Sequence, residues 1–134
     1  MTSTIDSITF DASHAASLAR FWCEVLPDYE IAPYGPEDIE QLKAKGIDDV
    51  EDDPNVMVLS SSGGPRLFFQ TVPEPKTAKN RMHLDVRLRD RAHLDRLLAL
   101  GATVVSEWPN GDGVWLTDPQ GNDFCAYFPA DTGA

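Results

Sequence analysis

Residues 81–100 have the sequence RMHLDVRLRDRAHLDRLLAL, in which the pattern of a strand is followed by that of a helix. In 81–87 apolar and polar residues alternate, as is typical of a strand with one buried face. From Asp90, a good N-cap residue, the apolar residues recur at helical spacing. Gly101 stands where glycine commonly ends a helix. The stretch therefore predicts a strand over 81–87 and a helix that begins after Asp90.

The same order of patterns occurs near the start of the chain. Residues 5–12 alternate as in a strand, Ser13 is the expected N-cap, and Trp22 lies on the apolar face of the expected helix. Pro27 ends that helix, because the residue before a proline avoids helical backbone angles. Three strands are expected after each helix, over 29–32, 55–60 and 66–72 and over 102–107, 114–117 and 123–128.

Strand, helix and three strands thus occur twice, which predicts an α+β fold made of two βαβββ modules. A doubly wound fold is disfavoured, since it needs a helix between each pair of parallel strands. We expect one domain over 1–134, with modules at about 4–73 and 80–129.

An acidic insertion over 33–54 interrupts the first module. It holds eight of the acidic residues of a chain whose net charge is −11, and 39–45 can form one or two helical turns. It is expected to be a solvated surface segment or, alternatively, a docking patch for a cation or a basic partner. A chain this acidic repels phosphate backbones, so nucleic-acid binding is disfavoured and no nucleic-acid partner is expected.

No apolar run approaches the length of about 20 residues that spans a bilayer, and 1–4 show no secretion signal. The only cysteines, Cys23 and Cys125, are expected to be reduced thiols. The sequence predicts a cytoplasmic protein without a membrane partner.

Three short motifs resemble those of one superfamily. Residues 118–122 (DPQGN) are similar to its turn before the last strand, Phe21-Trp22 to the aromatic pair of its first helix, and 100–102 (LGA) to the end of its second helix. The chain is identified as a member of the glyoxalase/bleomycin-resistance/dioxygenase group, the vicinal oxygen chelate superfamily. Residues 69–85 further resemble a subgroup of glyoxalase-like domains.

The resemblance implies a curved, cup-like mixed sheet around a ligand, often completed by a homodimer. It also implies metal-ligand positions, which fall here on Ser7, Gln70, His83 and Cys125. Only His83 matches the family's residue types, so no cofactor is expected. If a divalent metal binds, the expected ligands are Gln70, His83 and Cys125, a set that Zn²⁺ accepts.

Strand alternation sets the expected concave face of the cup. Its aromatic and polar mixture suits a small organic ligand. The expected ligand-binding residues are Ser7, Thr9, Phe68, Gln70, His83, Trp115, Cys125 and Tyr127.

Two other functions stay open. One is an enzyme of lyase or isomerase type, with His83 and Asp85 as catalytic acid and base or with the metal set above. The other is an interaction module that uses the acidic segment.

Several single residues also carry expectations. Cys125 is either a nucleophile activated by His83 or a small buried apolar residue. Lys76, Lys79 and Arg81 form either a solvated connector or a basic rim that meets anions. His14 and His93 are expected at the surface.

Overall fold

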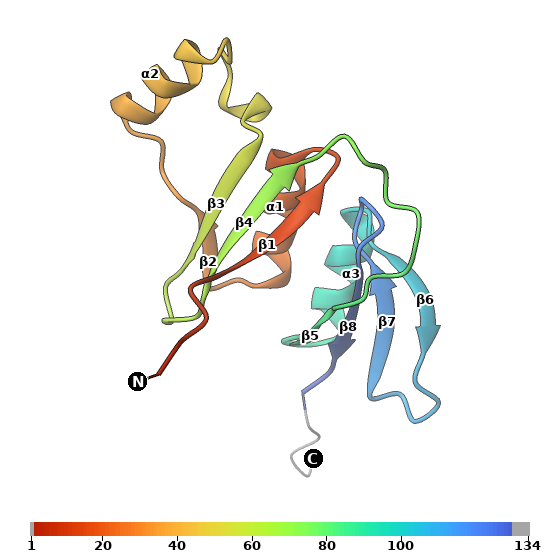
Figure 1. Ribbon diagram of the computed structural model, residues 1–134. Helices are drawn as coiled ribbons and strands as arrows, with labels where there is room; N and C mark the ends of the chain where they lie inside the picture. The colour runs from red at the N-terminus through yellow and green to blue at the C-terminus, as the bar shows by residue number, and fades with distance from the viewer. Residues whose placement is uncertain (1, 130–134) are drawn as a thin grey trace. The chain divides into compact units, whose positions relative to one another are not determined.

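The computed structural model describes residues 2–129 and divides the chain into two compact units, Met1–Pro75 and Lys76–Ala134 (Figure 1). Each unit contains one helix that follows its first strand, and one four-stranded mixed sheet. Both units therefore have the order βαβββ, which confirms the α+β class and the two modules.

The first unit holds β1 to β4 and is extended by the acidic insertion. Its sheet has the order β1-β4-β3-β2, with β1 parallel to β4 and the other pairs antiparallel. Its elements are β1 (Ser7–Ala12), α1 (Ala15–Val25), β2 (Tyr29–Ile31), α2 (Pro36–Ala44), the short 3-10 helix η1 (Val50–Asp52), β3 (Asn55–Ser60) and β4 (Arg66–Thr71).

The second unit repeats this topology without an insertion. Its sheet has the order β5-β8-β7-β6, again with only the first pair parallel. Its elements are β5 (Leu84–Arg87), α3 (Arg91–Ala99), β6 (Thr103–Glu107), β7 (Gly113–Thr117) and β8 (Asp123–Tyr127).

Each unit buries one face of its sheet. In the first, Trp22 of α1 is buried as expected, and the Phe10 ring lies 5.0 Å from its ring and 4.9 Å from that of Phe69. In the second, Leu97 of α3 and Phe124 of β8 are fully buried. The other face of each sheet carries polar as well as aromatic side chains, among them the exposed Gln70 in the first unit and Asp85 in the second.

The turn before β8 satisfies its own polar groups. Asp118 is buried, and its carboxylate accepts hydrogen bonds from the backbone N–H of Gln120 at 2.9 Å and of Asn122 at 3.0 Å. Gly121 has a φ of +90°, a left-handed conformation that favours glycine. The motif at 118–122 thus forms a turn that sets where β8 begins.

Two expectations about histidines and caps are wrong. The N-cap of α1 is His14 rather than Ser13, since the Nδ1 atom of His14 accepts the backbone N–H of Ser17 at 3.3 Å. His93 is 2% exposed instead of lying at the surface. It sits in the first turn of α3, where its Nδ1 accepts the backbone N–H of Arg89 at 3.3 Å.

The first strand of the second module, β5, is shorter than expected. Alternation predicted a strand from residue 81, but β5 begins at Leu84, and Met82 is 68% exposed. Asn80 is hydrogen-bonded to Asp123 instead, so the chain reaches the sheet only after this anchor.

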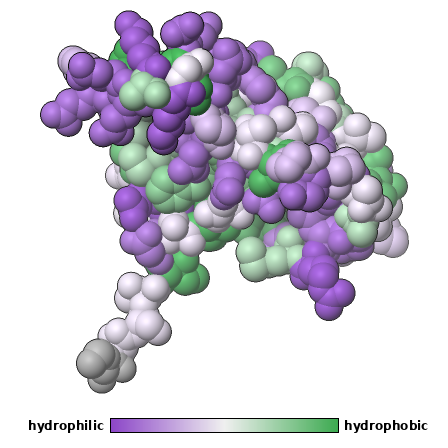
Figure 2. Space-filling view, turned by 45° about the horizontal axis from the view of Figure 1, so that its top comes forward, coloured by the Kyte–Doolittle hydropathy of each residue, from purple (hydrophilic) through white to green (hydrophobic). Residues whose placement is uncertain are grey.

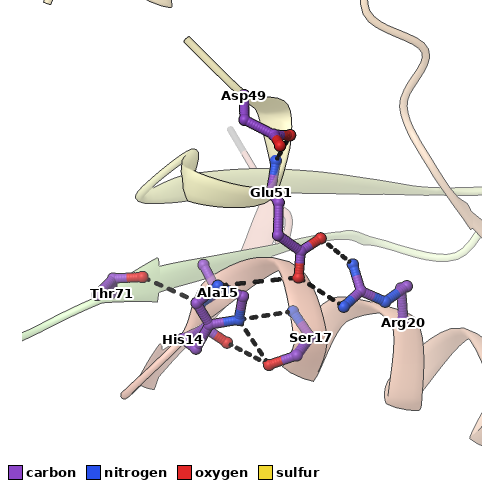
Figure 3. Close-up of polar contacts among 7 residues, drawn as sticks. All are labelled: His14, Ala15, Ser17, Arg20, Asp49, Glu51 and Thr71. Carbon is purple, nitrogen blue, oxygen red and sulfur yellow. Dashed lines mark hydrogen bonds and ion pairs between the residues drawn. The ribbon is translucent and has the colours of Figure 1, made fainter. Parts of the chain in front are cut away.

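The acidic insertion is more ordered than expected and is joined to α1 (Figure 3). Its helix α2 starts at Pro36, and the Asp38 carboxylate accepts the backbone N–H of Gly35 at 2.8 Å. Glu51 of η1 accepts two hydrogen bonds from Arg20, at 2.6 and 2.7 Å, and its carboxylate lies 3.9 Å from His14 Nε2. The insertion projects at the upper left of Figure 2, where hydrophilic residues dominate its surface.

No helix within residues 2–129 is both long and apolar enough to cross a bilayer.

Candidate functional site

The polar face of the second sheet carries a row of three aligned side chains. Asp85 of β5 pairs with Cys125 of β8, which pairs with Trp115 of β7. Directly paired residues of neighbouring strands point to the same face, so these side chains lie side by side. Strand alternation predicted this set correctly.

His83 joins this row immediately before β5. Its Nδ1 lies 3.2 Å from a carboxylate oxygen of Asp85, and the Asp85 carboxylate also accepts a hydrogen bond from the Cys125 thiol. One potential ligand atom from each of the three residues lies within 4.8 Å of the others. The side chains of His83 and Asp85 are 37% and 55% exposed, whereas Cys125 is buried. The result is a compact N, O and S donor set open on one side.

The surroundings of Cys125 keep its thiol protonated. Burial raises its pKa, and the neighbouring Asp85 charge raises it further. A nucleophilic cysteine needs the opposite shift, because the thiolate is the reactive form. The structure therefore favours the interpretation of Cys125 as a small buried residue over that of a nucleophile.

Asp123 anchors the connector that leads into this site. Its carboxylate accepts the backbone N–H of Asn80 at 2.9 Å and the indole N–H of Trp115 at 3.1 Å, and lies 3.8 Å from Lys76 Nζ. Burial alone would raise the pKa of Asp123, but these hydrogen bonds and the charges of Lys76 and Lys79 outweigh it and lower the pKa. The side chain therefore serves as an internal acceptor.

Cations and aromatic rings surround the row. Lys79 Nζ lies 5.6 Å from the centre of the Trp115 ring, and the Arg87 guanidinium lies 5.8 Å from that of Tyr127. Both distances are within the range of cation–π attraction. Two of the basic residues of the predicted rim, Lys76 and Lys79, are thus engaged within the second unit.

Trp108 is a residue of this face that the sequence did not reveal. Its ring lies 6.2 Å from that of Tyr127, beyond a bulge in β6 between Val104 and Ser106. It can lie there because Gly113 has no side chain: a Cβ at that position would come within 2.6 Å of the indole nitrogen. The available signal in the sequence was Gly113 immediately before the expected strand, five residues after Trp108, because a glycine there leaves room for a large ring.

The first-module candidates lie on β1 and β4 of the other unit. Thr9 is directly paired with Phe68, but Ser7 pairs with Arg66, and Gln70 pairs with Asp11. Ser7 and Gln70 are therefore four residues out of register, about 13 Å along the strands. Gln70 has Asp11 beside it, a residue that the sequence did not single out.

These positions decide how well the family's metal set fits. The superfamily often uses a divalent metal, but Ser7 and Gln70 are too far apart to contact one ion, and no carboxylate stands at the four implied positions. That set does not fit. The His83, Asp85 and Cys125 set includes a carboxylate and lies within one unit.

Comparison with known proteins agrees with this architecture. The family model of the glyoxalase-like domain matches residues 7–127. Among functionally curated proteins there is no match.

Solved structures of the same fold cover nearly the whole chain. A fosfomycin resistance protein, FosX, from Listeria monocytogenes has a TM-score of 0.63 at 13% identity, covering 97% of this chain and 94% of its own. A glyoxalase/bleomycin resistance protein/dioxygenase family enzyme from Burkholderia phytofirmans PsJN has a TM-score of 0.62 at 13% identity, covering 94% of this chain and 98% of its own. A glyoxalase-related enzyme from Fulvimarina pelagi has a TM-score of 0.60 at 17% identity, covering 96% of this chain and 89% of its own.

The repeated βαβββ topology, the buried turn before β8 and the match over 7–127 lead to one conclusion. The chain belongs to the glyoxalase-like domain family, within the vicinal oxygen chelate superfamily of glyoxalase, bleomycin-resistance and dioxygenase proteins.

Proposed function

We propose that this protein binds a small organic molecule against the polar face of β5, β8 and β7. The observation that carries the proposal is the combination of aromatic and polar groups on that face. Trp115 and Tyr127 offer ring surfaces, and the His83–Asp85 pair offers hydrogen bonds beside them. Ligand sites commonly combine apolar surface with a few fixed polar groups.

The fitting ligand is a planar molecule that carries a polar substituent. A ring can stack on Trp115 or Tyr127, as aromatic pairs do. A polar substituent can then bond to His83, and an anionic one can meet Lys79 or Arg87. In the first module, Ser7, Thr9, Phe68 and Gln70 remain predicted ligand-binding residues.

The three tryptophans allow a residue-specific test. Trp108 and Trp115 lie on the second unit, whereas Trp22 is buried against α1's own sheet and serves as an internal control. Their indole N–H signals in an ¹⁵N-labelled sample are assigned with single Trp→Phe variants. The probe is the molecule released from the purified protein by denaturation and identified by mass spectrometry or, if none is released, a set of small aromatic acids.

We expect the probe to shift the signals of Trp108 and Trp115 and to leave that of Trp22 unchanged. Tyr127→Ala should weaken binding about tenfold or more, since a stacking surface is lost. A probe that shifts only Trp22, or no saturable shift with any probe, contradicts the proposal.

A second candidate function is catalysis by the His83–Asp85 pair. The observation in its favour is the 3.2 Å contact, because a carboxylate that orients an imidazole is a common arrangement for a general base. Incubation of the probe with the protein, followed by NMR of the probe, separates the two functions. Unchanged probe supports binding alone, and conversion that is lost in His83→Ala supports an enzyme.

We further propose that the protein works in the cytoplasm as a homodimer. The two cysteines are free, which suits a reducing compartment. The family resemblance supports the dimer.

A further inference from the structure

We propose that His83, Asp85 and Cys125 form a Zn²⁺ site contained entirely in the second module. The site uses the His83–Asp85 pair that the proposed organic ligand would also contact, but its test needs no organic ligand. It also differs from the family's metal set, which draws on both modules and does not fit this chain.

The distances between donors suit zinc. In a tetrahedral site with the usual bond lengths, donor atoms lie about 3.3–3.6 Å apart. Here His83 Nδ1 and an Asp85 oxygen are 3.2 Å apart, and the three donor atoms all lie within 4.8 Å of one another. Small side-chain rotations bring all three into coordination distance.

The backbone holds these donors in place. Asp85 and Cys125 are direct partners in the parallel β5–β8 pair, so the hydrogen-bonded strands hold their side chains next to each other on one face. Asn80, three residues before His83, is fixed to Asp123 of β8 by two hydrogen bonds. Metal sites gain affinity when their ligands are positioned before the ion arrives.

The donor chemistry selects the ion. A thiolate and an imidazole favour zinc over Mg²⁺ or Ca²⁺, which take oxygen ligands. Zn²⁺ binding would displace the proton of the Cys125 thiol, and the anionic Asp85 and Cys125 groups would then balance the two charges of the ion. Three protein ligands leave a fourth position on the exposed side of His83 and Asp85.

The test is a titration of the metal-free, full-length protein with Co²⁺, a spectroscopic substitute for Zn²⁺. A thiolate ligand produces a charge-transfer band in the near ultraviolet, and four-coordination produces intense visible bands. We expect both bands to saturate at one equivalent and to disappear when Zn²⁺ is added. Mg²⁺ should not displace the cobalt.

Matched variants locate the site. Cys125→Ser should remove the charge-transfer band, and Asp85→Asn or His83→Ala should weaken Zn²⁺ binding at least about tenfold. The chain offers two controls, Cys23→Ser in α1 and Asp95→Asn on the exposed side of α3, which should bind like the wild type. The indole N–H spectrum verifies that each variant is folded.

One measurement needs no variant. Zn²⁺ should slow the alkylation of Cys125 by iodoacetamide at least about tenfold and leave that of Cys23 unchanged, as mapped by mass spectrometry. The proposal is overturned by equal protection of both cysteines, by a cobalt band that survives Cys125→Ser, or by no saturable binding in the micromolar range.

Discussion

Asp123 shows how one buried carboxylate can organise a site without taking part in it. Asp123 is the first residue of β8. Its carboxylate binds the backbone N–H of Asn80 in the incoming connector, the indole N–H of Trp115 and the ammonium group of Lys76. Each of these groups would lose a partner if the carboxylate were removed. An unsatisfied buried donor costs about 1–3 kcal/mol.

Asp123→Asn should therefore lower the free energy of unfolding by about 1–3 kcal/mol at neutral pH. Because folding lowers the pKa of Asp123, its contribution is fully present above the pKa of an unfolded aspartate and is lost as the pH falls through the folded value. The difference between wild type and variant should thus shrink in acid. Urea unfolding at several pH values measures it, with the exposed Asp95→Asn as the control. A difference that stays constant with pH would refute this role.

Gly113 makes a second residue-scale prediction. A Cβ there would lie 2.6 Å from Trp108 Nε1 and 2.8 Å from the Ala126 carbonyl oxygen, which is backbone and cannot move aside. Gly113→Ala should cost about 1–3 kcal/mol, as overpacking does, and should shift the Trp108 indole signal. At Gly35 the nearest atom would be 3.5 Å away, so Gly35→Ala should cost much less. Equal costs for the two variants would contradict the packing role of Gly113.

The elements show which features sequence patterns can predict. Alternation in β5, β7 and β8 placed Asp85, Cys125 and Trp115 on one face, and the register confirms it. Asp90 was a predictable cap because its side-chain type caps many helices. His14 was not, since an imidazole caps α1 only when its neutral nitrogen turns toward Ser17.

Other features depend on contacts between distant residues. His93 is buried because of how the start of α3 packs, which its helical position did not reveal. Trp108 lies near Tyr127 just after β6, a strand whose register is shifted by a bulge, and bulges have weak sequence signals. Such tertiary effects explain why the residues on the polar face of the second sheet were only partly predictable.

The Asp90 cap can be tested on α3 directly. Its carboxylate accepts the backbone N–H of His93 at 2.9 Å. Asp90→Ala should reduce the free energy of unfolding by about 0.5–2 kcal/mol, whereas Asp90→Ser should retain most of it, because serine also caps. Chemical denaturation of the two variants measures this, and equal losses would show that the hydrogen bond contributes little.

The attachment of the insertion to α1 makes a different prediction. The Arg20 hydrogen bonds lower the pKa of Glu51, so the pair is charged at neutral pH. Glu51→Gln should leave the melting temperature nearly unchanged, because exposed ion pairs contribute little to global stability. It should nevertheless speed amide hydrogen exchange in η1 and the end of α2. Glu37→Gln, in the first turn of α2, is the control. Unchanged amide exchange in Glu51→Gln would contradict the role of the Arg20–Glu51 pair in holding the insertion to α1.

At the scale of the whole molecule, the repeat was the most predictable property. Two copies of strand, helix and three strands were visible in the alternation and helical spacing, and both sheets have the same strand order. The identity of the ligand does not follow from these patterns, since periodicity describes the strands and helices of each module and not what its faces bind.

The proposed homodimer is the prediction that belongs to this scale. Each four-stranded sheet ends in edge strands, β1 and β2 or β5 and β6, and exposed edges tend to be covered by other chain segments. Light scattering coupled to size-exclusion chromatography should give twice the mass of one chain at micromolar concentration. The mass of a single chain across that range would contradict the dimer.

The unequal connections in the two modules have a practical consequence. The link from β2 to β3 carries residues 32–54, whereas its counterpart from β6 to β7 needs only 108–112. Because the entropy of closing a loop grows slowly with its length, the same scaffold accepts both. The longer link is thus a natural splice point: trimming it to a short hairpin, or exchanging it for a reporter peptide, removes Leu42 and the Glu51 contact with α1 but none of the strands.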